Sequence, residues 1–179
     1  MGAERLIPLL AVAALAGGCR DEAPAGAEEN TVERNVESAV VERVNDGDTI
    51  TLRDGEKVRL VQIDAPELTT DCFGRAASKA LAALVAAGTS VTLARDPRLD
   101  DRDSYGRILR YVLVRGANVN VALVRRGAAS PYFFRRQRGM YAGDLDRAVR
   151  DARAARRGYW GACPRAELNT AIGAITGPA

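Results

Sequence analysis

The residues best suited to chemistry surround one short apolar run, residues 60–63 of the 179-residue sequence. Arg59 precedes this run, and Asp64 and Glu67 follow it. A carboxylate can bind a hard cation or accept a proton, and a guanidinium can grip an oxyanion with two hydrogen bonds. Each of the three residues has a simple structural interpretation as an edge or surface charge. Their position on both sides of an apolar run favours a functional site.

Two further carboxylates, Asp46 and Asp48, flank Gly47 earlier in the chain. Aspartate and glycine are favoured in tight turns because they form local hydrogen bonds and accept positive φ. Taken alone, this pair therefore predicts only a hairpin turn. Its combination with Arg59, Asp64 and Glu67 favours a functional site over a turn alone.

The composition limits the available chemistry, because the sequence contains no histidine. Histidine acid–base catalysis, histidine-ligated zinc and Ser-His or Cys-His nucleophiles are therefore excluded. Catalysis must use carboxylates, arginine, lysine, tyrosine or a hard metal ion. Residues 36–179 carry 23 Lys and Arg against 17 Asp and Glu. This net positive charge fits an anionic partner such as nucleic acid or a membrane surface.

The first 35 residues predict an exported protein. The apolar run 6–18 is too short for a membrane-spanning helix but suits the core of a signal peptide. It ends in Leu15-Ala-Gly-Gly-Cys19, which resembles a bacterial lipoprotein cleavage box with Cys19 as the acylated residue. Residues 1–19 are thus a leader, and the acidic residues 20–35 predict a disordered tether. The alternatives are simple cleavage, which gives a secreted or periplasmic protein, and a retained N-terminal anchor.

The three cysteines agree with export. If Cys19 is lipidated, Cys72 and Cys163 remain as a pair. In an oxidising compartment a disulfide between them would close a loop of about 90 residues and contribute about 2–4 kcal/mol. The alternative is a cytosolic protein in which both are free thiols.

The elements that must position these residues form a short series of strands and helices. Alternating apolar residues and turn signals predict strands over 38–44, 49–53, 58–63, 90–94 and 107–114. Helices are predicted over 75–87, 119–126 and 143–157, with Asn118 or Asn120 beginning the second. This order predicts an α+β fold, a five-stranded β-barrel of the OB type with three helices. We expect the domain to span residues 36–165 and the tail, 166–179, to be frayed.

One geometric condition follows from the strand prediction. Strict alternation places Arg59 and Asp64, five residues apart, on opposite faces of a strand. They can converge only if the strand bends or ends before Asp64, which Pro66 makes plausible.

Four ordered pieces of the sequence resemble the staphylococcal nuclease (thermonuclease) family. They are Asp46-Gly-Asp-Thr49, Arg59-Leu-Val-Gln-Ile-Asp-Ala-Pro-Glu67, Asp103-Ser-Tyr-Gly-Arg107 and Val119-Asn-Val-Ala-Leu-Val-Arg-Arg-Gly127. The resemblance extends from about residue 40 to Trp160. The sequences around Cys72 and Cys163 resemble those of exported bacterial members.

The resemblance implies a calcium site. Its ligands would be Asp48, Asp64 and the main-chain carbonyl of Ala65, with Asp46 as a nearby carboxylate. Residue 65 is alanine where the best-known members have threonine, a change that a main-chain ligand tolerates.

The resemblance also implies Arg59, Glu67 and Arg107 as catalytic residues and Tyr105 as a residue lining the nucleotide pocket. Tyr132 is assigned to substrate binding, although its loop only loosely matches the base-stacking tyrosines of the family. This chemistry suits phosphodiester hydrolysis, in which guanidiniums neutralise the phosphoryl oxygens and a carboxylate activates water.

The resulting prediction is an exported, calcium-dependent nuclease that acts as a monomer. By resemblance it cleaves DNA and RNA, single strands preferred, with low sequence specificity and 3′-phosphate products. Its second partner would be the membrane, through the N-terminal lipid anchor. Two alternatives remain: a non-catalytic OB module that binds nucleic acid, and an envelope-anchored adhesion protein that binds peptide or glycan. Neither alternative explains the complete set of charged residues.

Overall fold

The computed structural model describes Met1 and residues 35–179. The predicted leader, the predicted tether and Cys19 therefore lie outside the described residues. Among the residues that are described, no helix combines the length and apolar character needed to cross a membrane.

Five strands form a closed barrel. They are β1 (Val36–Val44), β2 (Thr49–Leu52), β3 (Lys57–Leu60), β5 (Ser90–Ala94) and β6 (Ile108–Val114). Strand β1 pairs antiparallel with both β2 and β5, and β5 pairs with β6. A parallel pairing of β3 with β6 closes the barrel. The predicted α+β fold with a five-stranded OB-type barrel is confirmed.

The strands face a continuous apolar core because their apolar residues alternate. Val41, Ile50, Leu60, Leu93 and Val112 are among the side chains that are almost fully buried inside the barrel. A register shift between Val41 and Arg43 marks a bulge, which lets β1 bend and pair with both β2 and β5.

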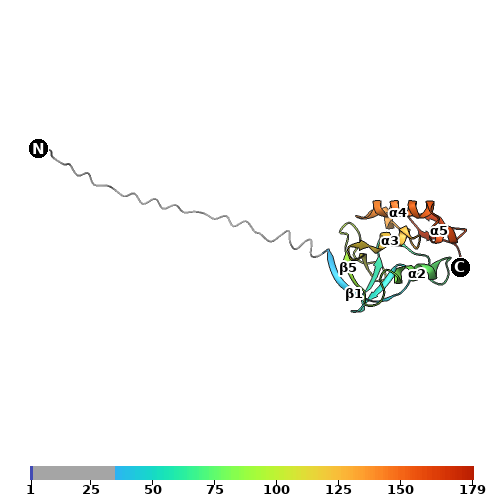
Figure 1. Ribbon diagram of the computed structural model, residues 1–179, viewed down its shortest axis with the longest axis horizontal. Helices are drawn as coiled ribbons and strands as arrows, with labels where there is room; N and C mark the ends of the chain where they lie inside the picture. The colour runs from blue at the N-terminus through green and yellow to red at the C-terminus, as the bar shows by residue number, and fades with distance from the viewer. Residues whose placement is uncertain (2–34) are drawn as a thin grey trace.

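The described helices are α2 (Gly74–Ala82), α3 (Val119–Arg125), α4 (Ala142–Ala154) and the short α5 (Tyr159–Ala162). Helices α3 and α4 pack together on one side of the barrel, and α2 lies at the end where the C-terminal residue is found (Figure 1). The side chain of Asn118, not that of Asn120, caps α3 by accepting a hydrogen bond from the Val121 amide at 3.0 Å.

Two predicted helices were too long. Helix α2 ends at Ala82 instead of continuing to residue 87, because the chain must turn so that the Gly88 amide can reach the Val41 carbonyl at 2.8 Å. Helix α4 ends at Ala154 instead of residue 157. Arg156 has a φ of +50°, which ends the helix, and the following turn carries Tyr159 to the Gly127 carbonyl.

The predicted strand 58–63 is interrupted. Strand β3 ends at Leu60, Gln62 takes a φ of +63°, and a separate two-residue strand, β4 (Ile63–Asp64), follows. Strand β4 pairs with β8 (Ser130–Pro131) outside the barrel. Because Arg59 and Asp64 no longer belong to one continuous strand, the alternation of side chains does not place them on opposite faces. The break therefore meets the condition for their convergence.

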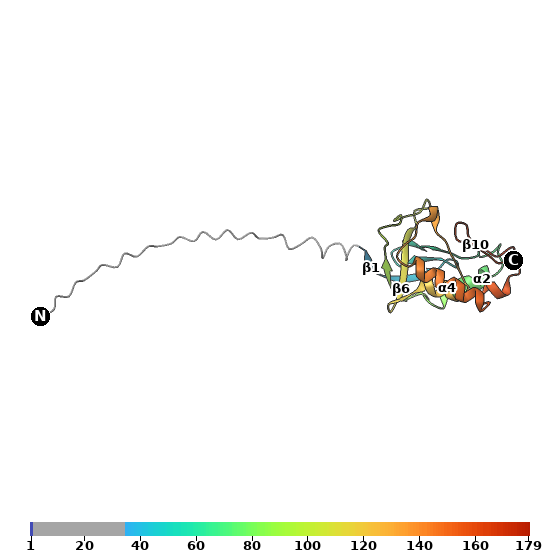
Figure 2. The same cartoon turned by 90° about the horizontal axis from the view of Figure 1, so that it is seen from above.

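The prediction of a frayed tail was wrong. Residues 166–179 contain a hairpin of β9 (Glu167–Asn169) and β10 (Gly173–Ile175). Figure 2 shows β10 beside the barrel at the same end as α2. The chain after the hairpin runs along residues 70–72, where the Cys72 amide donates to the Gly177 carbonyl at 2.8 Å. A disulfide joins Cys72 to Cys163 just before the hairpin.

Candidate active site

The Asp-Gly-Asp turn is more than a connection between strands. Asp46 accepts a hydrogen bond from the Asp48 amide at 2.9 Å, which fixes the turn. A Cβ on Gly47 would come within 2.5 Å of the Ala65 Cβ, so only glycine lets the turn pack against the segment after β4. The Asp48 carboxylate then accepts a hydrogen bond from the Ala65 amide at 3.0 Å. The turn and the end of β4 are thus one structural unit.

Arg59 joins the two carboxylates predicted to bind metal. Its Nη1 lies 3.1 Å from Asp48 Oδ2, and its Nη2 lies 2.6 Å from Asp64 Oδ1. The guanidinium also donates to the Ile63 carbonyl at 2.9 Å. The side chain is largely buried, and its position depends on the strand break described above, which turns Asp64 toward it.

Burial and neighbouring charges both shift the pKa values in this cluster. Burial raises the pKa of Asp48 to about 6, and the nearby carboxylates of Asp46 and Asp64 add to this, although Arg59 acts in the opposite direction. The pKa of Arg59 is raised despite its burial, because Asp48 and Asp64 stabilise its charge.

Glu67 lies at the rim of the same site and is exposed. Within the described part of the chain, its carboxylate has neither a hydrogen bond nor an ion pair, so both oxygens are free to accept a proton. Its main chain is closely packed, because a Cβ on Gly74 would lie 2.0 Å from the Glu67 carbonyl oxygen. The start of α2 thus holds the backbone of Glu67 while its side chain remains available.

Arg107 is held less tightly than Arg59. Its Nε donates to Asp103 at 2.7 Å and its Nη1 to the Thr49 hydroxyl at 3.2 Å. The guanidinium lies 5.4 Å from the ring centroid of Tyr105, which is 84% exposed. These contacts leave Arg107 half-buried at the edge of the site, where an anion can reach it.

Two adjoining cavities surround these residues. The carboxylate cavity, of about 430 Å³, is lined by all the predicted catalytic and metal-binding residues and by Tyr105: Asp46, Asp48, Arg59, Asp64, Ala65, Glu67, Tyr105 and Arg107. The aromatic cavity, of about 460 Å³, shares Arg59, Asp64, Tyr105 and Arg107 with it. The structure therefore brings the predicted site residues together from distant parts of the sequence.

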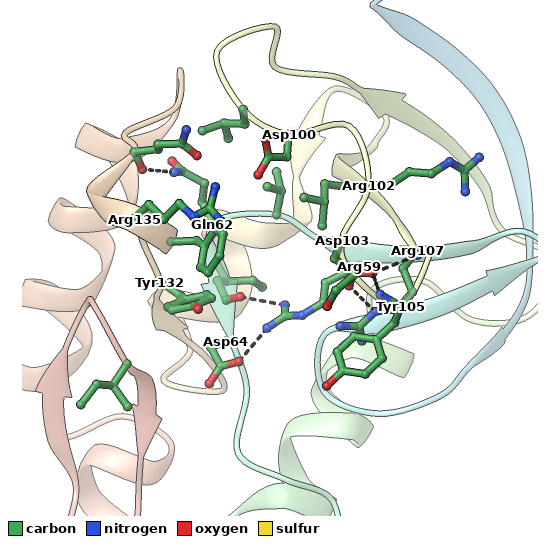
Figure 3. A pocket seen from close by; sticks show the side chains of 18 residues that line it. Arg59, Gln62, Asp64, Asp100, Arg102, Asp103, Tyr105, Arg107, Tyr132 and Arg135 are labelled. Atoms are coloured by element: carbon green, nitrogen blue, oxygen red, sulfur yellow. Dashed lines mark hydrogen bonds and ion pairs between the residues drawn. The ribbon is translucent and has the colours of Figure 1, made fainter.

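Tyr132 lies on the far side of the aromatic cavity. Figure 3 shows it across the cavity from Tyr105, with Arg59 and Asp64 between them. Phe134, whose ring centroid is 6.3 Å from that of Tyr132, lines the same wall. Arg135 lines the cavity as well, whereas Arg138 pairs with Asp146 at 2.5 Å and stabilises the fold instead.

Two buried polar residues that were not predicted from the sequence also position the site. Gln62 accepts a hydrogen bond from the Gly139 amide and donates to the Gln137 carbonyl, which fixes the loop carrying Tyr132. Asn120 donates to the Val61 carbonyl at 2.9 Å and so holds the break between β3 and β4. A polar side chain inside an otherwise apolar run, as at Gln62, was the available signal.

The fold and the cluster define a class of protein, an OB-type barrel with carboxylates and arginines gathered in one cavity. The model of the family described as staphylococcal nuclease homologue matches residues 57–162. The chain belongs to the staphylococcal nuclease family, and the predicted resemblance is confirmed.

The related proteins include enzymes by name. Endonuclease YhcR of Bacillus subtilis (strain 168) is 38% identical over 109 residues, which are 52% of this chain and 9% of that protein. The thermonuclease of Staphylococcus intermedius is 35% identical over 106 residues, 55% of this chain and 61% of that protein. An uncharacterized endonuclease of Haemophilus influenzae (strain ATCC 51907 / DSM 11121 / KW20 / Rd) is 40% identical over 96 residues, 51% of each chain. The similarity thus covers less than two thirds of each relative.

Proposed function

We propose that this chain is a nuclease that hydrolyses phosphodiester bonds of DNA and RNA with the aid of Ca²⁺. The observation that carries the proposal is the convergence of Arg59, Arg107, Asp48, Asp64 and Glu67 on the carboxylate cavity. Guanidiniums at one wall and a free carboxylate at the rim match the two needs of the reaction, charge neutralisation and activation of water.

The calcium proposal rests on the donor set. In the described part of the chain, no group of three or more His, Cys, Asp or Glu side chains is placed to hold a metal ion. Asp48 and Asp64 would therefore bind the ion with the Ala65 carbonyl, water and substrate oxygens, which predicts weak affinity. Hard oxygen donors fit a hard cation here. Bound Ca²⁺ would neutralise charge on the phosphate.

In the reaction, Glu67 accepts a proton from a water molecule as the water oxygen bonds to phosphorus. Arg59 and Arg107 bind the phosphoryl oxygens, whose negative charge grows in the transition state. The bond from phosphorus to the 5′ oxygen breaks, and that oxygen takes a proton from solvent. The products are a 3′-phosphate end and a 5′-hydroxyl end.

The test is the release of acid-soluble nucleotides from denatured DNA, with millimolar Ca²⁺ and with EGTA. Glu67→Gln keeps the side-chain shape but removes the proton acceptor, so we expect turnover to fall by about 10² or more. Glu42→Gln, at an exposed surface ion pair, is the matched control. Near-normal turnover in Glu67→Gln would overturn the role of Glu67. Salt-sensitive DNA binding without cleavage by the wild type would favour the non-catalytic OB module.

We also propose that the protein is exported and lipid-anchored through Cys19, or secreted or periplasmic if the leader is only cleaved, and acts as a monomer. The proposal is supported by the leader sequence and by a Cys72–Cys163 disulfide, which suits an oxidising compartment. Partition of the full chain into a detergent phase tests the anchor, and recovery only in the aqueous phase would contradict it.

A further inference from the structure

The C-terminal hairpin lies outside the part of the chain that matches the family, residues 57–162, yet it packs directly on the site. The Ala174 amide in the middle of β10 donates to Asp64 Oδ2 at 2.9 Å. The Phe133 amide, in the loop that carries Tyr132, donates to the Thr170 carbonyl at 2.7 Å. The hairpin therefore contacts both a predicted metal ligand and the substrate-binding loop.

The turn of this hairpin is ordered by its own hydrogen bonds. The Asn169 side chain accepts from the Ala171 amide, and the Asn169 carbonyl accepts from the Ile172 amide, both at 3.1 Å. A Cβ on Gly173 would lie 2.3 Å from Asp64 Oδ2, so glycine is needed for the close approach. These contacts fix the backbone at Ile172 relative to Asp64.

Ile172 is 66% exposed and lines the aromatic cavity. A single exposed apolar residue is ordinary, but Tyr105 and Phe134, also among the large exposed apolar residues, line the same cavity. Three such residues around one opening indicate a surface that is covered when a ligand binds. The hairpin contributes one wall of that surface.

We propose that the hairpin β9–β10 is a specificity element, in which Ile172 packs against an unpaired nucleobase next to the scissile phosphate. This inference rests on the proposed nuclease function. A nucleobase is the occupant because the aromatic cavity continues into the phosphate site through Arg59 and Arg107. Its walls offer apolar faces for a flat ring, and Arg135 and Gln137 offer polar groups for the ring edge.

A cavity walled on opposite sides accepts a base only when the base has left the helical stack. A paired base in a duplex is covered by its neighbours on both faces, so it must first be unstacked. The Ile172 wall therefore favours single strands over duplexes, and it does so through binding instead of through the chemical step.

The experiment compares Ile172→Ala with Met140→Ala, a control that removes a large exposed apolar side chain outside both cavities. Rates are measured on a labelled single-stranded oligonucleotide and on the matching duplex. We expect Ile172→Ala to raise KM for the single strand about five- to tenfold with kcat nearly unchanged. KM for the duplex should change less, so the preference for single strands narrows. Equal changes for both substrates, or an unchanged KM, would overturn the proposal.

A second variant enlarges the side chain at residue 172 instead of truncating it. Ile172→Tyr supplies a larger flat surface, so it should bind the single strand at least as tightly as the wild type. Weakening equal to that of Ile172→Ala would show that any change at the hairpin is damaging and would contradict the proposal.

Direct binding separates this inference from the proposed function. Fluorescence anisotropy of the labelled single strand is measured in EGTA, where cleavage is not expected. If the wild type binds the single strand but never cleaves it with Ca²⁺, the nuclease proposal fails. The Ile172 variants then still test whether Ile172 contacts a bound base. If Ile172→Ala binds the single strand as tightly as the wild type, the proposed contact between Ile172 and a base is overturned, whether or not the wild type cleaves.

Discussion

The two cavities of the site share four residues but are built in different ways. The carboxylate cavity is formed at the ends of β3 and β4 and at the tight turn before β2, and its charges contact each other directly. The aromatic cavity includes barrel residues such as Arg59 and Leu109, but most of its lining comes from the loop carrying Tyr105, the segment carrying Tyr132 and the hairpin turn. The rings of Tyr105 and Phe134 are exposed. The first cavity is therefore held by contacts at the barrel, whereas most of the second depends on loops and on the hairpin.

From this difference we expect the carboxylate cavity to act in the chemical step and the aromatic cavity to act in substrate binding. Electrostatic stabilisation of a transition state requires groups that are already in place, because reorganisation during the reaction raises the barrier. Arg59, held by two carboxylates and a carbonyl, meets that requirement. Recognition of bases with low sequence specificity requires instead surfaces that accept any flat ring. Changes in the carboxylate cavity should therefore alter kcat, and changes in the aromatic cavity should alter KM.

The largest effect is expected from Arg59→Lys. Lysine keeps the charge, but its compact ammonium cannot span Asp48 and Asp64 as the planar guanidinium does. We expect kcat for single-stranded DNA to fall about 10²- to 10³-fold, with a small change in KM. The control is Arg43→Lys, at an exposed ion pair with Glu42. A loss confined to KM would refute the division of tasks.

An intermediate effect is expected from Gly173→Ala, because Gly173 lies where the hairpin meets the carboxylate cavity. The added methyl group would collide with Asp64, and we expect kcat to fall about 10- to 100-fold through the displaced carboxylate. Gly116→Ala is the matched control, since Gly116 also has positive φ but has no atom within 4 Å of an added Cβ. That control should lose only about 1–2 kcal/mol of stability from backbone strain. Equal kcat values in the two variants would show that the hairpin does not position Asp64.

The barrel strands and the charged residues of the carboxylate cavity could be predicted from the sequence, whereas the conformation that brings those charged residues together could not. Strand β5 covers the predicted residues 90–94, and β1, β2 and β6 begin and end near their predicted positions, because alternation of apolar residues reports burial directly. Strand β3 ends three residues earlier than predicted. The charged residues of the carboxylate cavity were also found, because the chemistry restricts which side chains can serve. Their convergence needed the break at Gln62. Pro66 made a break before Asp64 plausible, but glutamine as a residue type does not indicate a positive φ.

The hairpin could not be predicted for a different reason. Residues 166–179 are short of large apolar side chains, and their order comes from contacts with distant segments: the Gly177 carbonyl with the Cys72 amide, the Ala179 amide with the Thr70 carbonyl, and Ala174 with Asp64. Such contacts follow from the completed fold. The overlong helices 75–87 and 143–157 have the same cause, since tertiary contacts overrode local helix propensity.

The smallest effect is expected from Asp96→Asn, which tests how firmly the barrel supports the aromatic cavity. Asp96 is buried and accepts hydrogen bonds from the Arg98 side chain and the Met140 amide, so it ties together the two loops that reach the cavity through Leu99 and Gln137. Burial acts to raise the pKa of Asp96, but these hydrogen bonds outweigh it and hold the pKa below its ordinary value of 3.8.

Because the pKa is lower in the folded state, the ionised Asp96 stabilises the fold above its ordinary pKa, and this contribution disappears as the pH falls below that value. We expect Asp96→Asn to lower the free energy of unfolding by about 1–2 kcal/mol at pH 7, and the difference from wild type to shrink toward pH 3. Urea unfolding across this range measures it, with Asp54→Asn at an exposed turn as the control. If the difference stayed constant with pH, the stabilisation would come from packing, and the loops of the aromatic cavity would not depend on this charge.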